Sequence, residues 1–520
     1  MLFNLTWLAE NQPFPPLREI ERLNRYIENR SLFDSDHFAT KDFRSKKNVY
    51  EKCAERISRV IGNFEDVISF PVLLNYQRLM SLKMADLICG EYPTITTDTD
   101  ENIQKLDDAR AESDFDQQLY STVIDISRYG DAVWRAYKKV DGSIIFTIWD
   151  PVEWFPIVAQ DGTKNIIAHV LAWLVNNVET PEMLPPNYEL HVQIHWTEWA
   201  DQERQGRVGT YEAQKWQLTG DGSSIVHKIS SEIISTGLES CAVFHLRSFA
   251  VSNTVYGYDD YTPIDSLLSE IMTRIGQISI ILDKHADPNI TGPVSMLQQN
   301  PETGEFYLKM GKFWATSTGE NEPKYLTWDG QLGAAFNELE FLINQLYILS
   351  ELGAALIGAT DSVGGAISGT AMRFKLVNPL AKARRTANAL TLGVRKLFGL
   401  MSGVDYKNIS VFWEDGLPDD PRENVETAVL ASGSSSVMPL KQAIMEYFNR
   451  TSTEADEWVE AIQKAKEDQL KLEDKYSNEV ESVNHSGPGA VVNTSAKGST
   501  TGVNNFHGSR QSGTGTGGNK

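Results

Sequence analysis

Two long amphipathic segments, residues 263–285 and 331–357, constrain the fold of this chain more than any other feature. The first carries apolar residues at helical spacing, and the second carries them alternately four and three residues apart. That alternation is typical of a helix packed side by side with its neighbours. Between the segments lies an insert, residues 286–330, in which prolines and glycines separate short strand-like stretches. The sequence therefore predicts two long helices joined by a small inserted unit.

The second segment carries a narrow polar stripe. At about 100° per residue, Asn337, Glu340, Asn344 and Glu351 fall on one helical face, whereas much of the remaining surface is apolar. A helix that is covered on its flanks and polar along one line suits a ring of parallel helices around a wet channel. The same stripe suits the solvated face of an ordinary bundle, and periodicity alone favours this simpler interpretation.

The N-terminal half divides into a helical part and a β-rich part. Residues 17–130 are predicted to be mostly helical, with one helix at 49–61 and one long helix over 101–128. Residues 131–250 contain seven of the 12 tryptophans, and Asp-Gly pairs separate their β-rich runs, which predicts antiparallel hairpins. Aromatic residues on a sheet can bind sugars, so an aromatic-rich carbohydrate-binding module is an alternative, although core packing explains the tryptophans more simply.

The C-terminal part begins with a glycine-rich loop at 358–366, which we expect to be mobile because glycine allows many backbone states. A very long helix is predicted from about 366 to 401. Pro379 lies inside it and predicts a kink, because proline lacks a backbone donor and clashes with the preceding turn. A strand is expected at 409–413. Further helices and a disordered Gly/Ser-rich tail follow, at 421–432, 437–449, 452–475 and 476–520.

The charge balance and the missing motifs disfavour several classes of protein. The formal net charge is −22, whereas proteins that bind nucleic acid tightly are normally basic. The three cysteines are far apart, which supports neither a zinc knuckle nor a disulfide scaffold. We expect neither a secretory signal nor a membrane span, because no apolar run of about 18 residues occurs. No P-loop, HExxH or GxSxG motif is present.

The candidate catalytic groups are weak. His191 and His195 lie four residues apart in a β-like run that offers no further metal ligand. The acidic pairs Asp259-Asp260 and Asp419-Asp420 lie in turns, where turn chemistry explains them better than two-metal cleavage does. We therefore expect no catalytic residue, no metal and no cofactor. A metal-dependent nuclease or hydrolase built on these groups is the alternative that the sequence leaves open.

Four blocks of sequence resemble, in order, the portal protein family of long-tailed double-stranded DNA bacteriophages. The resemblance covers about residues 15 to 475, and the third block is the most recognisable, with Ser368, Gly369 and Arg373 in it. The blocks are NYQRLMSLKMADLICGEYP at 75–93, DKHADP at 283–288, ISGTAMRFK at 367–375 and WEDGLPDD at 413–420.

The resemblance implies an α+β portal fold assembled as a ring, usually of twelve subunits. A wing would comprise residues 1–262, and the two long segments would form a helical stem that lines the channel with Asn337, Glu340, Asn344 and Glu351. The other parts would be a small α/β clip at 286–330, a tunnel loop at 358–366, a kinked wing helix and strand at 367–413, a crown at 414–475 and the tail. The tunnel-loop residues nearest DNA would be Asp361, Ser362, Val363, Gly364 and Gly365.

The resemblance also implies partners and a location. Double-stranded DNA would pass through the ring without sequence specificity during packaging and ejection. The ring would dock the terminase, which carries the ATPase, and later a head-completion or adaptor protein, while capsid and scaffolding proteins would contact the wing. The chain would be made in the host cytoplasm and reside in the virion at one capsid vertex, without contact with a membrane.

Overall fold

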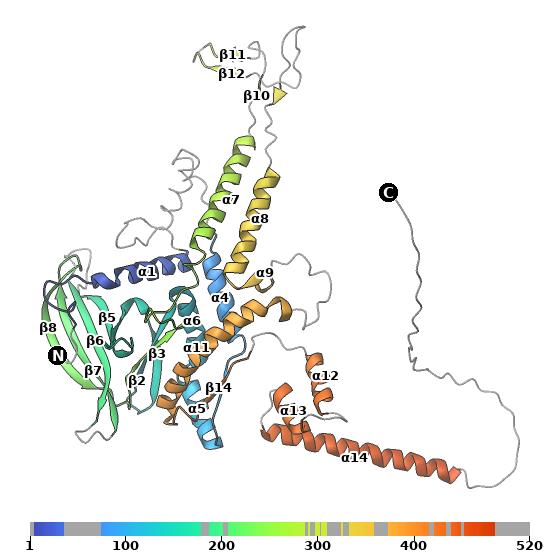
Figure 1. Cartoon of the computed structure of the whole chain (residues 1–520). Helices are drawn as coiled ribbons and strands as arrows, with labels where there is room; N and C mark the ends of the chain where they lie inside the picture. The colour runs from blue at the N-terminus through green and yellow to red at the C-terminus, as the bar shows by residue number, and fades with distance from the viewer. Residues whose placement is uncertain are drawn as a thin grey trace, which may run out of the picture. The chain divides into compact units, whose positions relative to one another are not determined.

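The structure, a computed structural model of the whole chain, has an α+β fold and divides into two compact units, residues 1–418 and 419–520 (Figure 1). Each unit is described by itself. The structure describes residues 5–35, 74–177, 187–200, 206–286, 290–291, 297–301, 303–308, 324–325, 332–357, 373–414, 421–432, 438–448 and 452–483.

Helices form the first part of unit 1. They are η1 (Leu17–Glu19), α1 (Ile20–Asp34), α4 (Tyr76–Cys89), α5 (Asp100–Glu112) and α6 (Phe115–Tyr129). α4 begins after Asn75, whose side chain accepts a hydrogen bond from the backbone N–H of Arg78 at 2.8 Å. The prediction of one helix over 101–128 is wrong, because Asp114 adopts a left-handed φ of 51° that separates α5 from α6. The helix predicted at 49–61 lies outside the described residues.

The predicted antiparallel β region is confirmed and forms two sheets. A three-stranded sheet has the order β3-β2-β9, and a five-stranded sheet has the order β4-β5-β6-β7-β8. The Asp-Gly pairs at 141–142, 161–162 and 221–222 lie in turns between consecutive strands, where each glycine takes a positive φ. The strands are β2 (Asp131–Lys138), β3 (Ile144–Trp149), β4 (Trp154–Val158), β5 (Ile166–Asn176), β6 (Tyr188–Trp199), β7 (Arg207–Leu218), β8 (Ile225–Ser235) and β9 (Val243–Arg247).

Most of the tryptophans of this region pack inside it. Trp134 and Trp154 are fully buried, and Trp196 and Trp216 are 4 % exposed. Trp134 also donates a hydrogen bond from Nε1 to Thr122 of α6 at 2.7 Å, which ties the sheet to the helical layer. Trp199 at the end of β6 is exposed. The burial supports core packing and leaves no open aromatic platform on these four side chains for a sugar.

The two predicted long helices lie side by side and project from unit 1 (Figure 1). α7 (Asp265–Ala286) matches its prediction closely, whereas the second segment is split into α8 (Leu332–Leu349) and α9 (Gly353–Leu356). The insert between them was predicted to be α/β, but its described residues form only strands, which pair as β10 with β13 and β11 with β12. Their bounds are β10 (Ile290–Thr291), β11 (Leu297–Gln299), β12 (Phe306–Leu308) and β13 (Lys324–Tyr325).

α11 (Val377–Ser402) crosses the core of unit 1. Leu390, Val394, Leu397 and Phe398 on its inner face are completely buried in the main hydrophobic core. After α11 the chain adds the predicted strand, β14 (Ser410–Phe412), which pairs antiparallel with β1 (Thr94–Thr96) from the far end of the sequence. This pairing joins a segment that contacts α5 to the segment that follows α11.

The predicted kink inside the long helix takes a different form. Residues 373–375 are helical, Leu376 interrupts the helix, and α11 starts at Val377, so Pro379 lies in the first turn of α11 rather than in a helix interior. Proline at 379 has no N–H to donate to the carbonyl of Lys375, four residues earlier, which accounts for a break at this point. The first turn tolerates the missing donor. Residues 366–372 of the predicted helix lie outside the described residues.

Unit 2 consists of three helices over the residues that the structure describes. They are α12 (Pro421–Ser432), α13 (Leu440–Tyr447) and α14 (Ser452–Val483). Ala443 of α13 and Ala455 of α14 are fully buried, and Lys441 forms an ion pair with Asp456 at 2.8 Å. The predicted start of the disordered tail at 476 is wrong, because α14 continues to Val483 with charged residues that favour helix.

Candidate functional site

The α7/α8 pair is held together by one apolar seam and one charged bridge. Leu268 and Ile271 of α7 and Leu346 of α8 are at most 1 % exposed and belong to the main core. Arg274 of α7 pairs with Glu270 on its own helix at 3.0 Å and with Glu338 of α8 at 3.1 Å. The facing sides of the two helices are therefore packed and paired within one chain.

The outer face of α8 carries the predicted polar stripe. Asn337, Glu340 and Asn344 are exposed, because Leu339 and Leu342 turn the opposite side of the helix toward the core. The three polar residues recur three and four positions apart, so they follow one line along the helix. The prediction that these three share a free face is confirmed.

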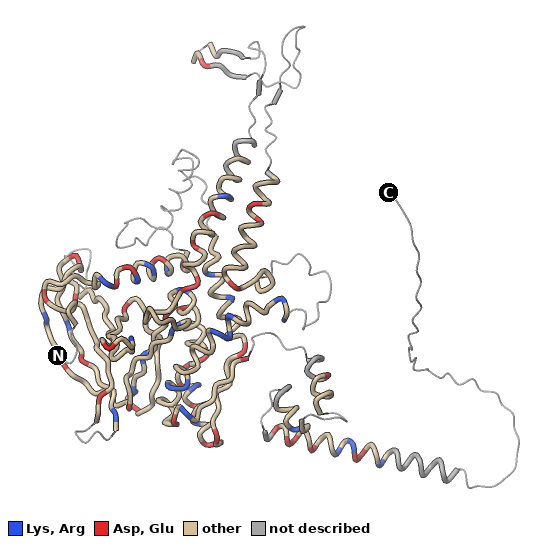
Figure 2. Tube along the Cα trace, viewed as in Figure 1, with Lys and Arg blue, Asp and Glu red and all other residues tan. Residues whose placement is uncertain are grey.

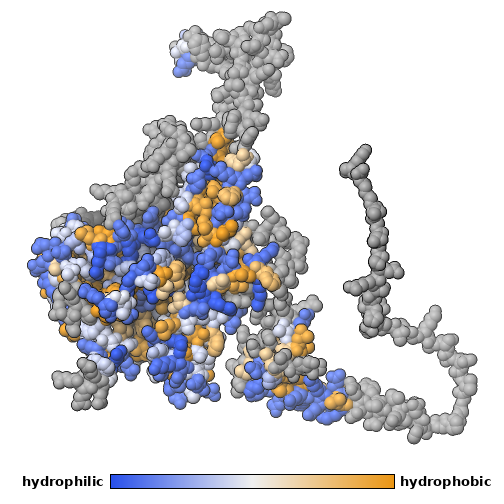
Figure 3. All heavy atoms as spheres, in the orientation of Figure 1, coloured by the Kyte–Doolittle hydropathy of each residue, from blue (hydrophilic) through white to orange (hydrophobic). Residues whose placement is uncertain are grey.

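Large apolar side chains are exposed beside that stripe. Phe341 and Ile348, seven residues apart on one face, are 60 % and 64 % exposed, and Phe336 and Leu349 are half exposed. Figure 3 shows apolar surface on the α7/α8 pair between hydrophilic areas. Exposed side chains as large as Phe341 and Ile348 together on one helix face indicate a surface that another protein covers.

Glu351 does not extend the stripe. It lies in the break between α8 and α9 with a left-handed φ of 61°, an uncommon conformation for a residue other than glycine. Its carboxylate accepts two hydrogen bonds from Arg385 of α11, at 2.9 and 3.0 Å. The prediction that Glu351 continues the exposed face of one long helix is therefore wrong, because the helix ends at Leu349 and the side chain turns toward α11.

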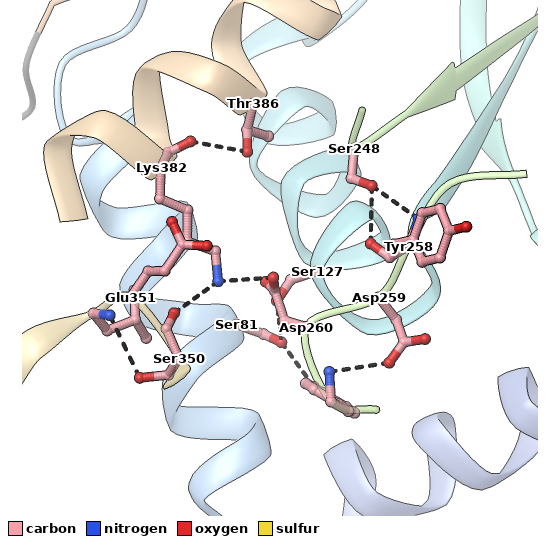
Figure 4. Close-up of polar contacts among 12 residues, drawn as sticks. Ser81, Ser127, Ser248, Tyr258, Asp259, Asp260, Ser350, Glu351, Lys382 and Thr386 are labelled. Carbon is pink, nitrogen blue, oxygen red and sulfur yellow. Dashed lines mark hydrogen bonds and ion pairs between the residues drawn. The ribbon is translucent and has the colours of Figure 1, made fainter. Parts of the chain in front are cut away.

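An ion pair with a buried lysine lies under the break. Lys382 of α11, which is 7 % exposed, approaches Asp260 at 2.7 Å and donates to the backbone carbonyl of Ser350 at 3.0 Å (Figure 4). The carbonyl of Ser350 belongs to the last turn of α8, which leaves carbonyls without helical partners. One ammonium group thus satisfies a helix end and a carboxylate together.

Further hydrogen bonds connect this ion pair to the N-terminal helices. Asp260 accepts from the hydroxyl of Ser127 at 2.7 Å, and its backbone N–H donates to the Ser127 carbonyl at 2.8 Å. Ser81 of α4 lies 2.9 Å from Ser127 and 2.7 Å from the hydroxyl of Tyr261. We call Ser81, Ser127, Asp260, Ser350 and Lys382 the junction cluster; it joins α4, α6, α8 and α11 at one point (Figure 4).

Asp259, next to the junction cluster, plays the predicted turn role. Its carboxylate accepts from the backbone N–H groups of Tyr261 and Thr262 at 3.0 and 2.7 Å. The prediction missed the role of Asp260, because its partner Lys382 is far away in the sequence. A lysine on the otherwise apolar side of a helix, between Ala381 and Ala383, was the one available signal.

α11 is unusually basic for so acidic a chain. It carries Lys382, Arg384, Arg385, Arg395 and Lys396 and contains no aspartate or glutamate (Figure 2). Lys382 and Arg385 hold the two carboxylates described above, and Arg395 donates to the carbonyls of Tyr406 and Lys407 at 3.0 and 2.8 Å. Much of this positive charge therefore fastens neighbouring segments to α11.

Comparison with known proteins gives one family match and one similar solved structure. Residues 18–209 match the family described as phage portal protein, SPP1 Gp6-like. Over these residues the chain is similar to the phage portal proteins. No curated protein matches the sequence. Among solved structures, a chain from the virion of a native gene transfer agent particle is similar, with 13 % sequence identity and a TM-score of 0.39 over 81 % of this chain and 98 % of that one.

The remaining portal residues predicted from the sequence are only partly visible. Arg373 is exposed in the helical residues 373–375, just before the break at Leu376. The tunnel-loop residues and two residues of the family motif lie outside the described residues; these are Asp361, Ser362, Val363, Gly364, Gly365, Ser368 and Gly369.

The histidines of β6 do not assemble a metal site. His191 lies 3.3 Å from Glu189, whereas His195 is buried and stacks on Tyr211. Burial lowers the pKa of His195 to about 3, so the imidazole is neutral near pH 7. Over the described ranges, the structure contains no group of three His, Cys, Asp or Glu residues that could hold a metal ion. Within those same ranges, no helix is long and apolar enough to cross a membrane.

Proposed function

We propose that this chain is the subunit of a phage portal ring, through which double-stranded DNA enters the capsid and leaves it. The observation that carries the proposal is the α7/α8 pair in a chain whose residues 18–209 match the portal family. Its outer face combines a polar line, Asn337 to Asn344, with large exposed apolar side chains. Exposed apolar side chains have no role in a helical bundle that stays alone. A ring of helix pairs needs them for contacts between copies and needs the polar line for its channel.

Assembly of copies accounts for the apolar part of this face. Phe341 and Ile348 lie directly beside the line of Glu340 and Asn344 on α8. When a neighbouring copy covers Phe341 and Ile348, the adjacent polar line is left facing the lumen. The ring would hold twelve subunits, the usual number in the family, and would reside at one capsid vertex of the virion.

The charge of the chain favours passage of DNA over tight binding of DNA. Each chain has a formal net charge of −22, so a ring of many copies carries a strongly negative field. DNA affinity depends on lysine and arginine contacts with phosphates, and the polar line on α8 has none. DNA would pass this surface by repulsion, without sequence-specific contacts. The tunnel loop at 358–366 would be the part nearest the DNA.

The other portal parts follow from the same proposal. The β-rich body with α11 would form the wing, which capsid and scaffolding proteins contact. The insert between α7 and α8 would form the clip, where the terminase docks during packaging and a head-completion or adaptor protein docks later. Unit 2 would form the crown. The chain itself would perform no catalysis and need no cofactor.

The polar line is tested by reversing its charge. Particles assembled with Glu340→Lys/Asn344→Lys chains should contain less DNA, because two cations per subunit in the lumen would bind phosphates and slow translocation. The measurement is nuclease-protected DNA per particle. The matched control is Lys215→Glu, which changes charge on β7, away from α8. Equal DNA content in all three particle types would overturn the assignment of this face to the channel.

A further inference from the structure

An arginine lies between the two sheets without a carboxylate partner. Arg135 of β2 projects on the same side as Val133, which packs against Leu171 of β5 in the space between the sheets. The Arg135 guanidinium is half-buried and lies over the ring of Trp149, 5.4 Å from its centre. Among the described residues it makes no hydrogen bond and no ion pair.

The surroundings of Arg135 make this unusual. The ionisable groups that act on it most are Tyr211 and Tyr137, and burial lowers the pKa of Arg135. The chain contains 70 aspartates and glutamates, yet none of the described ones pairs with this guanidinium. A charge taken out of water without a partner destabilises a fold, so an unpaired cation at such a place indicates a partner that comes from outside.

Two further polar groups of the same space also lack partners. Among the described residues, the Nε1 of Trp149 and the Nδ1 of His195 are buried and make no hydrogen bond. His195, 1 % exposed, stacks on Tyr211 with 5.0 Å between ring centres, and its charge interacts with that of Arg135. Buried polar atoms are normally hydrogen-bonded. Two buried nitrogens without hydrogen bonds near an unpaired guanidinium therefore indicate that a polar ligand binds there.

A row of ring contacts runs from Trp149 to a partly exposed histidine. Trp149 packs edge-on against Trp173 at 5.3 Å, and Trp173 contacts His191, whose side chain is 22 % exposed. The side chains that contact Trp149 are aromatic or basic, and the carboxylate of Glu189 is paired with His191 at 3.3 Å. A guanidinium over an indole ring still has N–H donors that can bind planar or tetrahedral oxygens.

We propose that Arg135, Trp149 and His195, with the hydroxyl of Tyr211, form a site for a small oxyanion, a hydrogen phosphate or a carboxylate group. Arg135 supplies the charge and two parallel donors. The indole N–H of Trp149 supplies a third donor. His195 is neutral, and its Nε2 donates to Oε1 of Gln193 at 3.2 Å, so its Nδ1 accepts and suits an oxyanion that keeps a proton.

The test is calorimetric titration of the full-length chain with phosphate and, in parallel, with acetate, at constant ionic strength in chloride. We expect one site per chain for at least one of the two anions, and the anion that binds identifies the ligand class. Arg135→Gln should weaken binding by about tenfold or more. The matched control is Arg207→Gln, because Arg207 also lies over a tryptophan, Trp199, at 5.0 Å but at an exposed position.

A second variant tests the site even if Arg135→Gln does not fold. Trp149→Phe keeps an aromatic ring under Arg135 but removes the indole donor, and it should weaken binding by a few-fold. Saturable binding that survives Arg207→Gln and is lost in Arg135→Gln supports the site. Binding of neither anion, or equal binding by the wild-type chain and by folded Arg135→Gln, overturns it.

Discussion

The base and the outer face of the α7/α8 pair differ in which side chains they bury and which they expose. At the base, the buried Lys382 is paired with the partly buried Asp260. On the outer face of α8, Glu340 and Asn344 are exposed beside exposed Phe341 and Ile348. At the base, the charged groups and the helix end find their partners within one chain. On the outer face, the apolar side chains become buried only when another copy covers them.

This difference separates two kinds of stability. Contacts at the base fix how α8 leaves the body, and they contribute to folding of a single chain. Contacts on the outer face contribute nothing until chains associate, so variants there should alter assembly and leave the fold intact.

The largest effect is expected from charges on the outer face. Phe341→Glu/Ile348→Glu should abolish assembly, because it places two carboxylates per chain where an apolar contact would form. Sedimentation velocity should show monomers with an unchanged circular dichroism spectrum. Val140→Glu, an exposed apolar residue in the β2–β3 turn, is the control and should assemble normally. Assembly of the double variant would remove the distinction between the two regions.

Loss of a buried charge at the base should act on the fold. Asp260→Leu should destabilise unit 1 by about 3–5 kcal/mol, because Lys382 would remain buried without its carboxylate. Chemical denaturation of the assembly-deficient chain measures this. Asp260→Leu/Lys382→Met should regain much of the loss, since no buried charge remains. A double variant as unstable as the single one would show that the ion pair is not the cause.

Acid should weaken the β-rich body. Burial lowers the pKa of His169 and of His195 to about 3, whereas the unfolded chain takes up these protons near pH 6.5. The unfolded state then binds more protons between these values, so stability falls as pH falls, by roughly 2 kcal/mol per histidine at pH 5. The raised pKa values of Glu153, about 7, and Asp125, about 6, act in the opposite direction.

Substitution of one histidine isolates this effect. His169→Gln keeps an acceptor for the Nε1 of Trp154, which bonds His169 at 3.1 Å, and it should flatten the dependence of the unfolding midpoint on pH below 6.5. His227→Gln, at an exposed position of β8, serves as control. An unchanged pH profile in His169→Gln would contradict the assignment of the acid sensitivity to His169.

The smallest effect is expected at Glu351 and Arg385. Both side chains are almost half exposed, at 44 % and 46 %, so a double-mutant cycle should give a coupling of about 0.2–1 kcal/mol that salt weakens. The corresponding cycle for Asp260 and Lys382 should be several times larger. Equal couplings would mean that burial does not distinguish the two bridges.

The sequence predicts the elements of this molecule better than their interruptions. Periodicity and Asp-Gly pairs predicted the α7/α8 pair and the antiparallel sheets, because both signals are local. The breaks at Asp114 and Glu351 were missed, because both residues take left-handed conformations that spacing does not reveal. The break at Leu376 was predicted only as a kink at Pro379. Arg385 stabilises the break at Glu351 through a contact between distant segments, which no spacing reveals.

The candidate site divides in the same way. Asn337, Glu340 and Asn344 were predictable because one continuous helix places them on a line. Lys382 and Asp260 were not, because their pairing depends on how α11 packs against the base of α8. The sequence therefore does not reveal ion pairs between distant segments, such as Lys382 with Asp260, and only the structure shows them.

Electron microscopy of the purified full-length chain tests whether α8 lines a channel. We expect closed rings with a central hole, in which the face of α8 with Glu340 and Asn344 lines the hole and Phe341 and Ile348 contact the neighbouring copy. A chain that stays monomeric at micromolar concentration, or a ring in which this face of α8 points away from the hole, would contradict it.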